Sequence, residues 1–121
     1  MTTAVINGCM LCKNWRLERD LYQLGIERVV LDNGQAPDEN FYTALLAGDH
    51  SPLSMRELLV VDYAKDMGTA PKDLASNEFF WRSFKAAYSD AEITDLTYCI
   101  AGWMAMGRLF HVLGVDRQCA L

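Results

Sequence analysis

The sequence predicts an all-α fold, and three observations lead to this class. Apolar residues recur with helical spacing along most of the chain, and no stretch shows the alternation typical of a half-buried strand. Glycine, proline or a capping residue separates each helical stretch from the next. With 121 residues, of which 51% are hydrophobic and 22% charged, the chain is long enough for one globular core. We therefore expect a single helical domain over residues 1–121.

The N-terminal part is predicted to form helices joined by short breaks. Asn7 is the predicted N-cap of a helix over residues 10–24, which ends at Gly25. Residues 26–31 are apolar enough for a short helix or a buried turn. The next helix is expected over residues 38–47, because a proline suits its first turn and a glycine follows it.

The middle of the chain begins with a capping box, in which a serine at the N-cap is followed three residues later by a glutamate. Ser54 and Glu57 form this pair. The helix that they open is predicted to reach Met67 and to stop at Gly68. Residues 69–73 are then expected to be a polar connection.

Two helices complete the predicted fold. Ser76 or Asn77 caps the first, whose wide aromatic face consists of Phe79, Phe80, Trp81, Phe84 and Tyr88. Ser89 and Glu92 form a second capping box at the start of the longest helix, over roughly residues 90–113. The apolar positions on one side of this helix are Ile93, Leu96, Ile100, Met104, Gly107 and Phe110.

The last helix also predicts an oligomer. A helix of this length and apolar character is hard for so small a chain to cover with its own neighbours. Gly102 and Gly107 lower its helix propensity, which close approach by another backbone would explain. We therefore expect residues 90–113 to be an oligomerisation helix.

Charge and hydropathy bear on the class of partner. The net charge of −5 argues against binding to nucleic acid or to an anionic membrane surface. No secretory signal is visible, and the longest apolar run, residues 99–107, is too short to cross a bilayer. We therefore expect a cytoplasmic protein whose four cysteines are reduced or catalytic rather than a framework of structural disulfides.

The candidate catalytic site is the Cys-x-x-Cys pair near the N-terminus. Cys9 and Cys12 lie one turn apart on the predicted helix, and Arg16 lies one turn further on the same face. The pair can form a short-range disulfide, and the helix dipole favours a thiolate at Cys9. The alternative is that one or both are ordinary buried cysteines, which pack as small hydrophobes.

Trp15, Asp62 and His111 are the candidate pocket or proton-relay residues. Trp15 is next to the cysteine pair, although core packing explains it as well. Asp62 interrupts an apolar helix face, so a buried polar role and a solvated position are both open. His111 is the candidate relay on the last helix, where packed or surface histidines are more common.

The two remaining cysteines have less defined roles. Cys99 is expected to be a buried structural thiol, because it lies among apolar residues in the middle of a helix. Cys119 could be part of the tail, a resolving thiol or a metal ligand. These two lack the close spacing of usual zinc sites, so we expect no bound metal and no cofactor.

Several blocks resemble the alkylhydroperoxidase D family, whose superfamily includes carboxymuconolactone decarboxylases. The block Asn7-Gly8-Cys9-Met10-Leu11-Cys12 is similar to the family's cysteine motif. Residues 88–96, 107–108 and 113–115 resemble its closing helix, and residues 54–64 its middle helix. The resemblance implies an antiparallel helical bundle, usually trimeric or hexameric, in which the cysteine pair is the redox centre of a thiol-dependent peroxidase.

The chain departs from this family pattern at three points. The family has a histidine four residues after the second cysteine, where this chain has Arg16. The family also has a relay glutamate before the first cysteine, whereas the first glutamate here is Glu18. The helices that normally precede the motif are missing, so we expect a short or N-terminally truncated member. Arg16 can favour a thiolate and bind an anion, but it cannot relay a proton.

The function expected from these residues is a weak thiol-dependent peroxidase or disulfide reductase, with a small peroxide or disulfide as substrate and a dithiol as electron donor. The helix dipole favours Cys9 as the attacking thiol, whereas the family pattern favours Cys12. A non-enzymatic or redox-sensing helical oligomer is the alternative. Lactone decarboxylation is a third reading, for which the sequence offers no adequate acid–base set.

Overall fold

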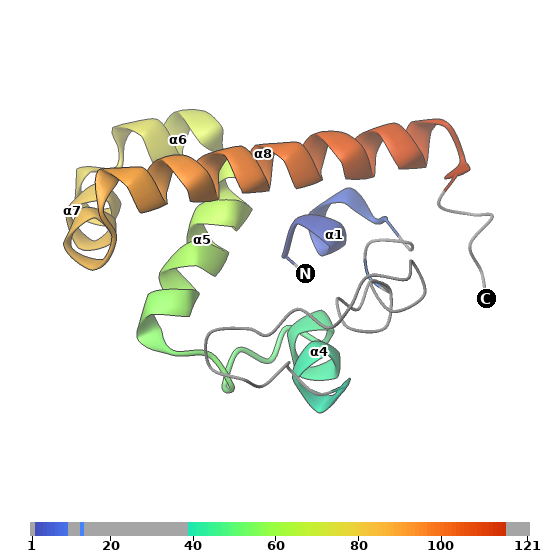
Figure 1. Cartoon of the computed structure of the whole chain (residues 1–121), viewed down its shortest axis with the longest axis horizontal. Coiled ribbons are helices and arrows are strands. Elements are labelled where there is room, and N and C mark those ends of the chain that lie inside the picture. Colours follow the sequence, from blue (N-terminus) through green and yellow to red (C-terminus); the bar gives the residue numbers. More distant parts are fainter. Residues whose placement is uncertain (1, 10–12, 14–38, 116–121) are drawn as a thin grey trace, which may run out of the picture.

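The computed structural model describes residues 2–9, 13 and 39–115, and every regular element in these ranges is an α-helix. The helices are α1 (Thr2–Asn7), α4 (Glu39–Leu46), α5 (Met55–Thr69), α6 (Pro71–Ser76), α7 (Glu78–Ala87) and α8 (Asp90–Val112). The longest, α8, crosses α5, while α6 and α7 lie toward its N-terminal end and α1 lies beside its C-terminal half (Figure 1). The predicted all-α class is therefore confirmed for the described part of the chain.

Most helix boundaries in the described part agree with the sequence. The helices α4, α5, α7 and α8 all begin within one residue of their predicted starts. Asn77 caps α7, since its side chain accepts a hydrogen bond from the backbone amide of Phe80. The predicted helix over residues 10–24 and the segment over residues 26–31 lie outside the described residues.

The connection between α5 and α7 differs from the prediction. The helix α5 does not stop at Gly68 but continues to Thr69, and residues expected to form a polar connection belong to α6. Gly68 serves packing here: a Cβ atom at this position would lie 2.8 Å from Cε of Met104 and 3.3 Å from the side chain of Ile6. Pro71 starts α6, where its missing N–H has no helical partner to lose.

The core joins α5, α6, α7 and α8. Its buried side chains are Tyr63, Ala64, Leu74, Phe80, Phe84, Ile100 and Met104. The ring of Tyr63 lies 4.7 Å from that of Phe84, and its hydroxyl forms a 2.7 Å hydrogen bond with Oγ1 of Thr97. The predicted aromatic face is thus largely confirmed. The placement of Phe79 on this face is wrong, because its side chain is 77% exposed.

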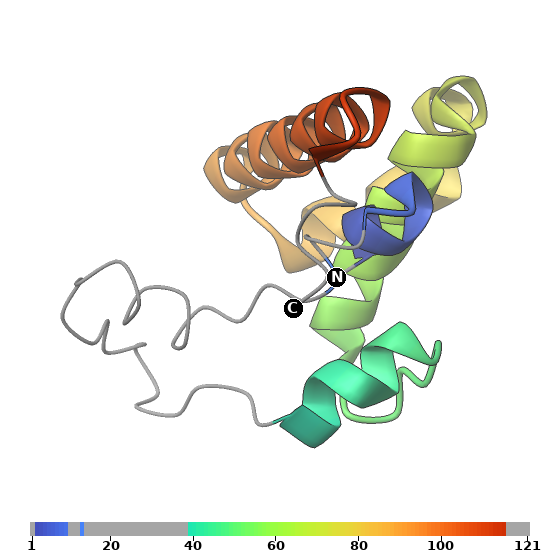
Figure 2. The ribbon, with the colours of Figure 1, turned by 90° about the vertical axis from the view of Figure 1, so that its right-hand side faces the viewer.

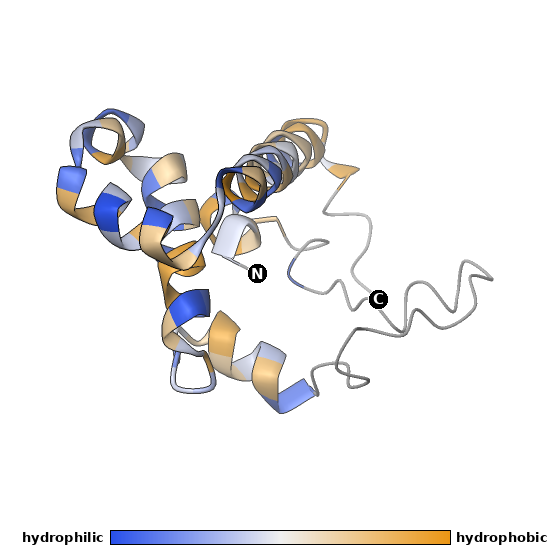
Figure 3. Cartoon of the chain, turned by 60° about the vertical axis from the view of Figure 1, so that its left-hand side comes forward, coloured by the Kyte–Doolittle hydropathy of each residue, from blue (hydrophilic) through white to orange (hydrophobic). Residues whose placement is uncertain are grey.

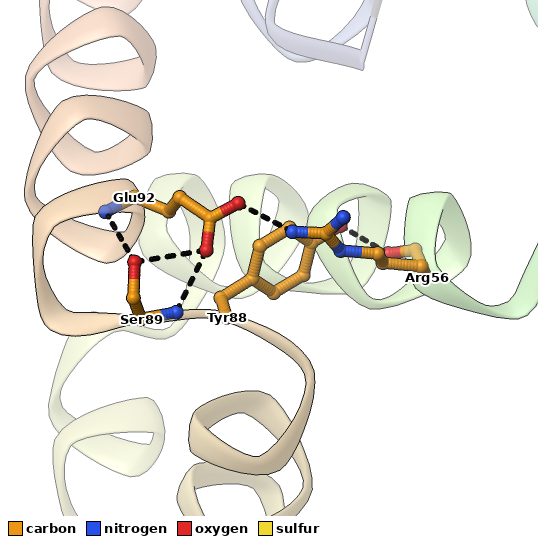
Figure 4. Close-up of polar contacts among 4 residues, drawn as sticks. All are labelled: Arg56, Tyr88, Ser89 and Glu92. Carbon is orange, nitrogen blue, oxygen red and sulfur yellow. Dashed lines mark hydrogen bonds and ion pairs between the residues drawn. The ribbon is translucent and has the colours of Figure 1, made fainter.

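The start of α5 is tied to the corner between α7 and α8 by a polar cluster (Figure 4). Arg56 Nη2 lies 2.5 Å from Glu92 Oε1, and the Arg56 guanidinium lies over the ring of Tyr88. The Tyr88 hydroxyl donates a 2.7 Å hydrogen bond to the backbone carbonyl of Arg56. Both predicted capping boxes are present, and Glu92 accepts from Ser89 at the start of α8. Glu92 therefore serves helix capping and helix docking together.

This arrangement predicts a loss of stability in acid. The backbone and side chain of Ser89 donate to Glu92 and, with Arg56, hold the pKa of Glu92 below its usual value of 4.5. Because the folded-state pKa is lowered, the stabilisation is present above about pH 4.5 and is lost as the pH falls through the folded pKa. Glu92→Gln keeps the hydrogen-bond acceptor and removes the charge. Urea midpoints measured at neutral and acid pH should differ less in this variant than in the wild type.

Glu78→Gln is the matched control, because this glutamate is exposed at the start of α7 and belongs to neither capping box. Its pH dependence should stay close to that of the wild type. An acid-induced shift of the same size in Glu92→Gln and the wild type would contradict the role of Glu92.

Candidate functional site

The first helix, α1, ends two residues before Cys9. Gly8 has a φ of 66°, which is the left-handed conformation that glycine adopts without strain. The amide of Gly8 donates to the carbonyl of Val5, and the amide of Cys9 donates to that of Ala4, both at 3.2 Å. This pair of hydrogen bonds is a Schellman motif, in which Gly8 ends the helix and Cys9 follows it.

The predicted N-cap role of Asn7 is wrong. Asn7 is the last residue of α1, and its Oδ1 atom is buried without a hydrogen-bond partner, so it accepts from no first-turn amide. Its Nδ2 atom instead donates to the backbone carbonyl of Met104 at 3.1 Å and, at 3.4 Å, to that of Trp103. The side chain therefore fastens the end of α1 to the middle of α8.

Two glycines let α1 come close to its neighbours. A Cβ atom at Gly107 would meet the side chain of Asn7, including its Cβ and Cγ at 3.2 Å, and Ile6 lies against Gly68 of α5. Figures 1 and 2 show α1 against both α5 and α8. The close approach predicted at Gly107 thus exists, but its partner is a side chain of the same chain.

Cys9 directly follows the docked helix α1 and has no exposed surface. Its sulfur is disulfide-bonded, and the bonding partner lies outside the described residues. Its carbonyl accepts a 3.0 Å hydrogen bond from the amide of Lys13, which has the spacing of a helical turn. Pairing between Cys9 and Cys12 agrees with these facts and stays a prediction.

The other predicted site residues fall into two groups. Cys12, Trp15 and Arg16 lie outside the described residues. Asp62, on α5, and His111, in the last turn of α8, are both exposed. For Asp62 the solvated alternative therefore applies, and neither residue supplies a buried polar group.

The expectation of a buried Cys99 is wrong. Cys99 is a free, exposed thiol. Its neighbour Ile100 takes the inward position on α8, in line with Met104 and Gly107, so Cys99 points away from the core. Gly102 lies outside the core as well, since a Cβ atom there would have no neighbour within 4 Å.

Among the described residues, no group of three or more His, Cys, Asp or Glu side chains is placed to hold a metal ion. No described helix is long and apolar enough to cross a membrane.

No protein-family model, curated protein or solved structure matches this chain.

The contact between α1 and α8 predicts opposite effects at two glycines. Gly107→Ala should destabilise the protein by about 1–3 kcal/mol, because the Cβ of Asn7 cannot rotate away and α1 must shift. Gly102→Ala meets no neighbour and should stabilise the helix by up to about 1 kcal/mol. Urea unfolding of the two variants beside the wild type measures both effects. Equal effects at the two positions would show that α1 does not depend on Gly107.

Proposed function

We propose that this chain is a thiol–disulfide redox protein in which Cys9 and Cys12 cycle between a disulfide and a dithiol, with weak peroxidase or disulfide-reductase activity. The observation that carries the proposal is the disulfide at Cys9, at the end of the docked helix α1. The protein is further proposed to be a cytoplasmic homo-oligomer with a bundle of the alkylhydroperoxidase D type. A soluble dithiol is its proposed electron donor.

The burial of Cys9 supports a division of roles within the pair. A peroxide cannot reach a sulfur that has no exposed surface, so we assign the attack to Cys12 and the resolving step to Cys9. The Cys12 thiolate takes one peroxide oxygen to become a sulfenic acid, and the other oxygen leaves as an alcohol or water. The Cys9 thiol then displaces water to form the disulfide, and the external dithiol reduces it to two thiols.

The activity is proposed to be weak because efficient proton donation to the leaving oxygen is missing. Arg16 stabilises a thiolate but keeps its own protons at neutral pH. Asp62 and His111 are exposed rather than held in a buried pocket. Neither residue is therefore proposed as a positioned general acid, a group that typically raises the reaction rate about 10²–10⁴-fold. Water is then the proton source.

A redox sensor without turnover is the second candidate, and the attachment of α1 favours it. Cys9 directly follows the helix that Asn7 fastens to the carbonyls of α8. Reduction of its disulfide removes a constraint from this junction, so the packing of α1 against α5 and α8 responds to the redox state. A partner could recognise this change without any consumption of peroxide.

Peptide mapping after mild oxidation tests the proposed pair. We expect Cys9 linked to Cys12, and in Cys9→Ser a sulfenic acid on Cys12 that dimedone traps. Cys99→Ser is the control and should leave both results unchanged, because Cys99 is already a free thiol. A link between Cys9 and Cys119 would overturn the assignment of the pair.

Peroxide consumption in the presence of excess dithiol separates the two candidates. A thiol-dependent enzyme consumes many equivalents per protein, whereas a sensor stops after about one equivalent. Cys12→Ser should abolish consumption in either case. Sustained turnover in that variant would exclude Cys12 as the attacking residue.

The position of Arg16 offers a further prediction. Arg16 follows Cys12 by four residues, and on the helix predicted over residues 10–24 a fixed cation at this spacing favours the thiolate, so Arg16→Ala should raise the thiol pKa and slow its alkylation at neutral pH. Arg16→His should raise peroxide turnover if a relay partner is in place, since histidine can donate a proton. If Arg16→Ala leaves the alkylation rate unchanged and Arg16→His leaves the turnover unchanged, Arg16 has no role at the thiol and serves only packing or the solvent-exposed surface.

A further inference from the structure

We propose that the outer face of α8 is the contact surface for a second copy of this chain, with the two faces meeting across a two-fold axis. This surface, the α8 stripe, consists of Tyr98, Gly102, Ala105, Met106, Leu109, Val112 and Leu113. The proposal is independent of the redox chemistry and names the surface that joins the copies.

The stripe runs along one side of the helix. Apart from the adjacent pairs Ala105–Met106 and Val112–Leu113, its members follow one another at intervals of three and four residues, and every one of them is exposed. The buried positions Ile100, Met104 and Gly107 occupy the opposite side and face α1 and the core. Figure 3 shows hydrophobic colouring along the C-terminal half of α8 and into the turn after it.

The size of the stripe points to an interface. Tyr98 is 77% exposed, Leu109 51% and Val112 83%. From these fractions and those of the other large members, the stripe leaves about 600 Å² of mostly apolar surface in contact with water, at the upper end for a monomer. Complete contact between two such faces buries at most about 1,200 Å², which is the lower end of the range of specific protein–protein interfaces.

Charge favours a second copy as the occupant. Arg108, three residues after Ala105 and four before Val112, lies at the edge of the stripe, whereas His111 falls outside its spacing. The seven members of the stripe are themselves uncharged, so the stripe holds no cluster of charges for an ionic partner. Two copies of a chain with a net charge of −5 repel one another over most of their surface, and a neutral face is where they approach at least cost.

Gly102 allows two copies of the stripe to pack closely against each other. Gly102 has no side chain, and a Cβ atom there would meet no neighbour within 4 Å; the exposed Tyr98 lies one turn before it and the exposed Met106 one turn after it. In an antiparallel pair that crosses near Gly102, the large side chains of one copy pack over the glycine of the other. Such a contact is isologous, so it produces an even number of copies.

The test is the association state of the full chain under reducing conditions, measured by light scattering and sedimentation at micromolar concentration. The wild type should be a dimer or a higher even-numbered assembly. Leu109→Glu places a charge within each face and should weaken association by about tenfold or more. Met55→Glu is the matched control, because Met55 is an equally apolar side chain, 79% exposed, outside the stripe. Circular dichroism checks that both variants keep their helices.

Cys99 provides a second readout beside the stripe, because it is free and exposed in the single chain. Its labelling by a maleimide, followed by peptide mapping, should slow as protein concentration rises and become fast again in Leu109→Glu. Labelling does not involve the Cys9 disulfide, so the result is independent of the redox proposal. Failure of peroxide consumption would leave this interface untouched.

Four outcomes would overturn the proposal. A monomer with rapidly labelled Cys99 means that nothing covers the stripe. A monomer with protected Cys99 means that another segment of the same chain covers it. A trimer is incompatible with a purely two-fold contact, and an assembly unchanged by Leu109→Glu is joined through a different surface.

Discussion

The close packing of α1 against two glycines is the constraint on which the site depends. Gly107 admits the side chain of Asn7 to the surface of α8, and Gly68 admits Ile6 to that of α5. A side chain at either glycine would occupy the space of α1. The Schellman turn at Gly8 then places Cys9 directly after this helix, without any exposed surface. Burial of the cysteine is thus a consequence of how the helix ends and docks.

That burial limits the chemistry open to the site. A thiol in the first turn of a helix is activated by unpaired amides, but Cys9 donates its own amide to Ala4 at the end of the preceding helix. Complete burial in addition keeps a peroxide from reaching its sulfur. Both effects argue against Cys9 as the attacking group, so the helix-dipole argument from sequence does not decide the order of attack.

Much of the fold was predictable because some sequence signals have a single structural use. The two Ser-x-x-Glu capping boxes start α5 and α8 where expected, and Ile100, Met104 and Gly107 form the buried face of α8. Other signals have two uses, and there the prediction fails. Gly68 is read as a helix stop but serves packing, and Asn7-Gly8 is read as the start of one helix but ends another. Cys99 follows the same logic, since mid-helix position says nothing about which side faces the core.

The helix α8 has two apolar faces, of which the inner one is covered by the chain itself and the outer one is exposed. Its inner face is closed by α1 and the core, through hydrogen bonds from Asn7 to the carbonyls of Trp103 and Met104. Its outer face has no described neighbour, as the open space above Gly102 shows. If α1 is released, Met104 and Gly107 lose their cover and α8 becomes apolar on both sides. A change at Cys9 that releases α1 would then uncover the inner face of α8, whereas the outer face that we propose to join two copies lies on the opposite side of the helix and keeps its residues as they are.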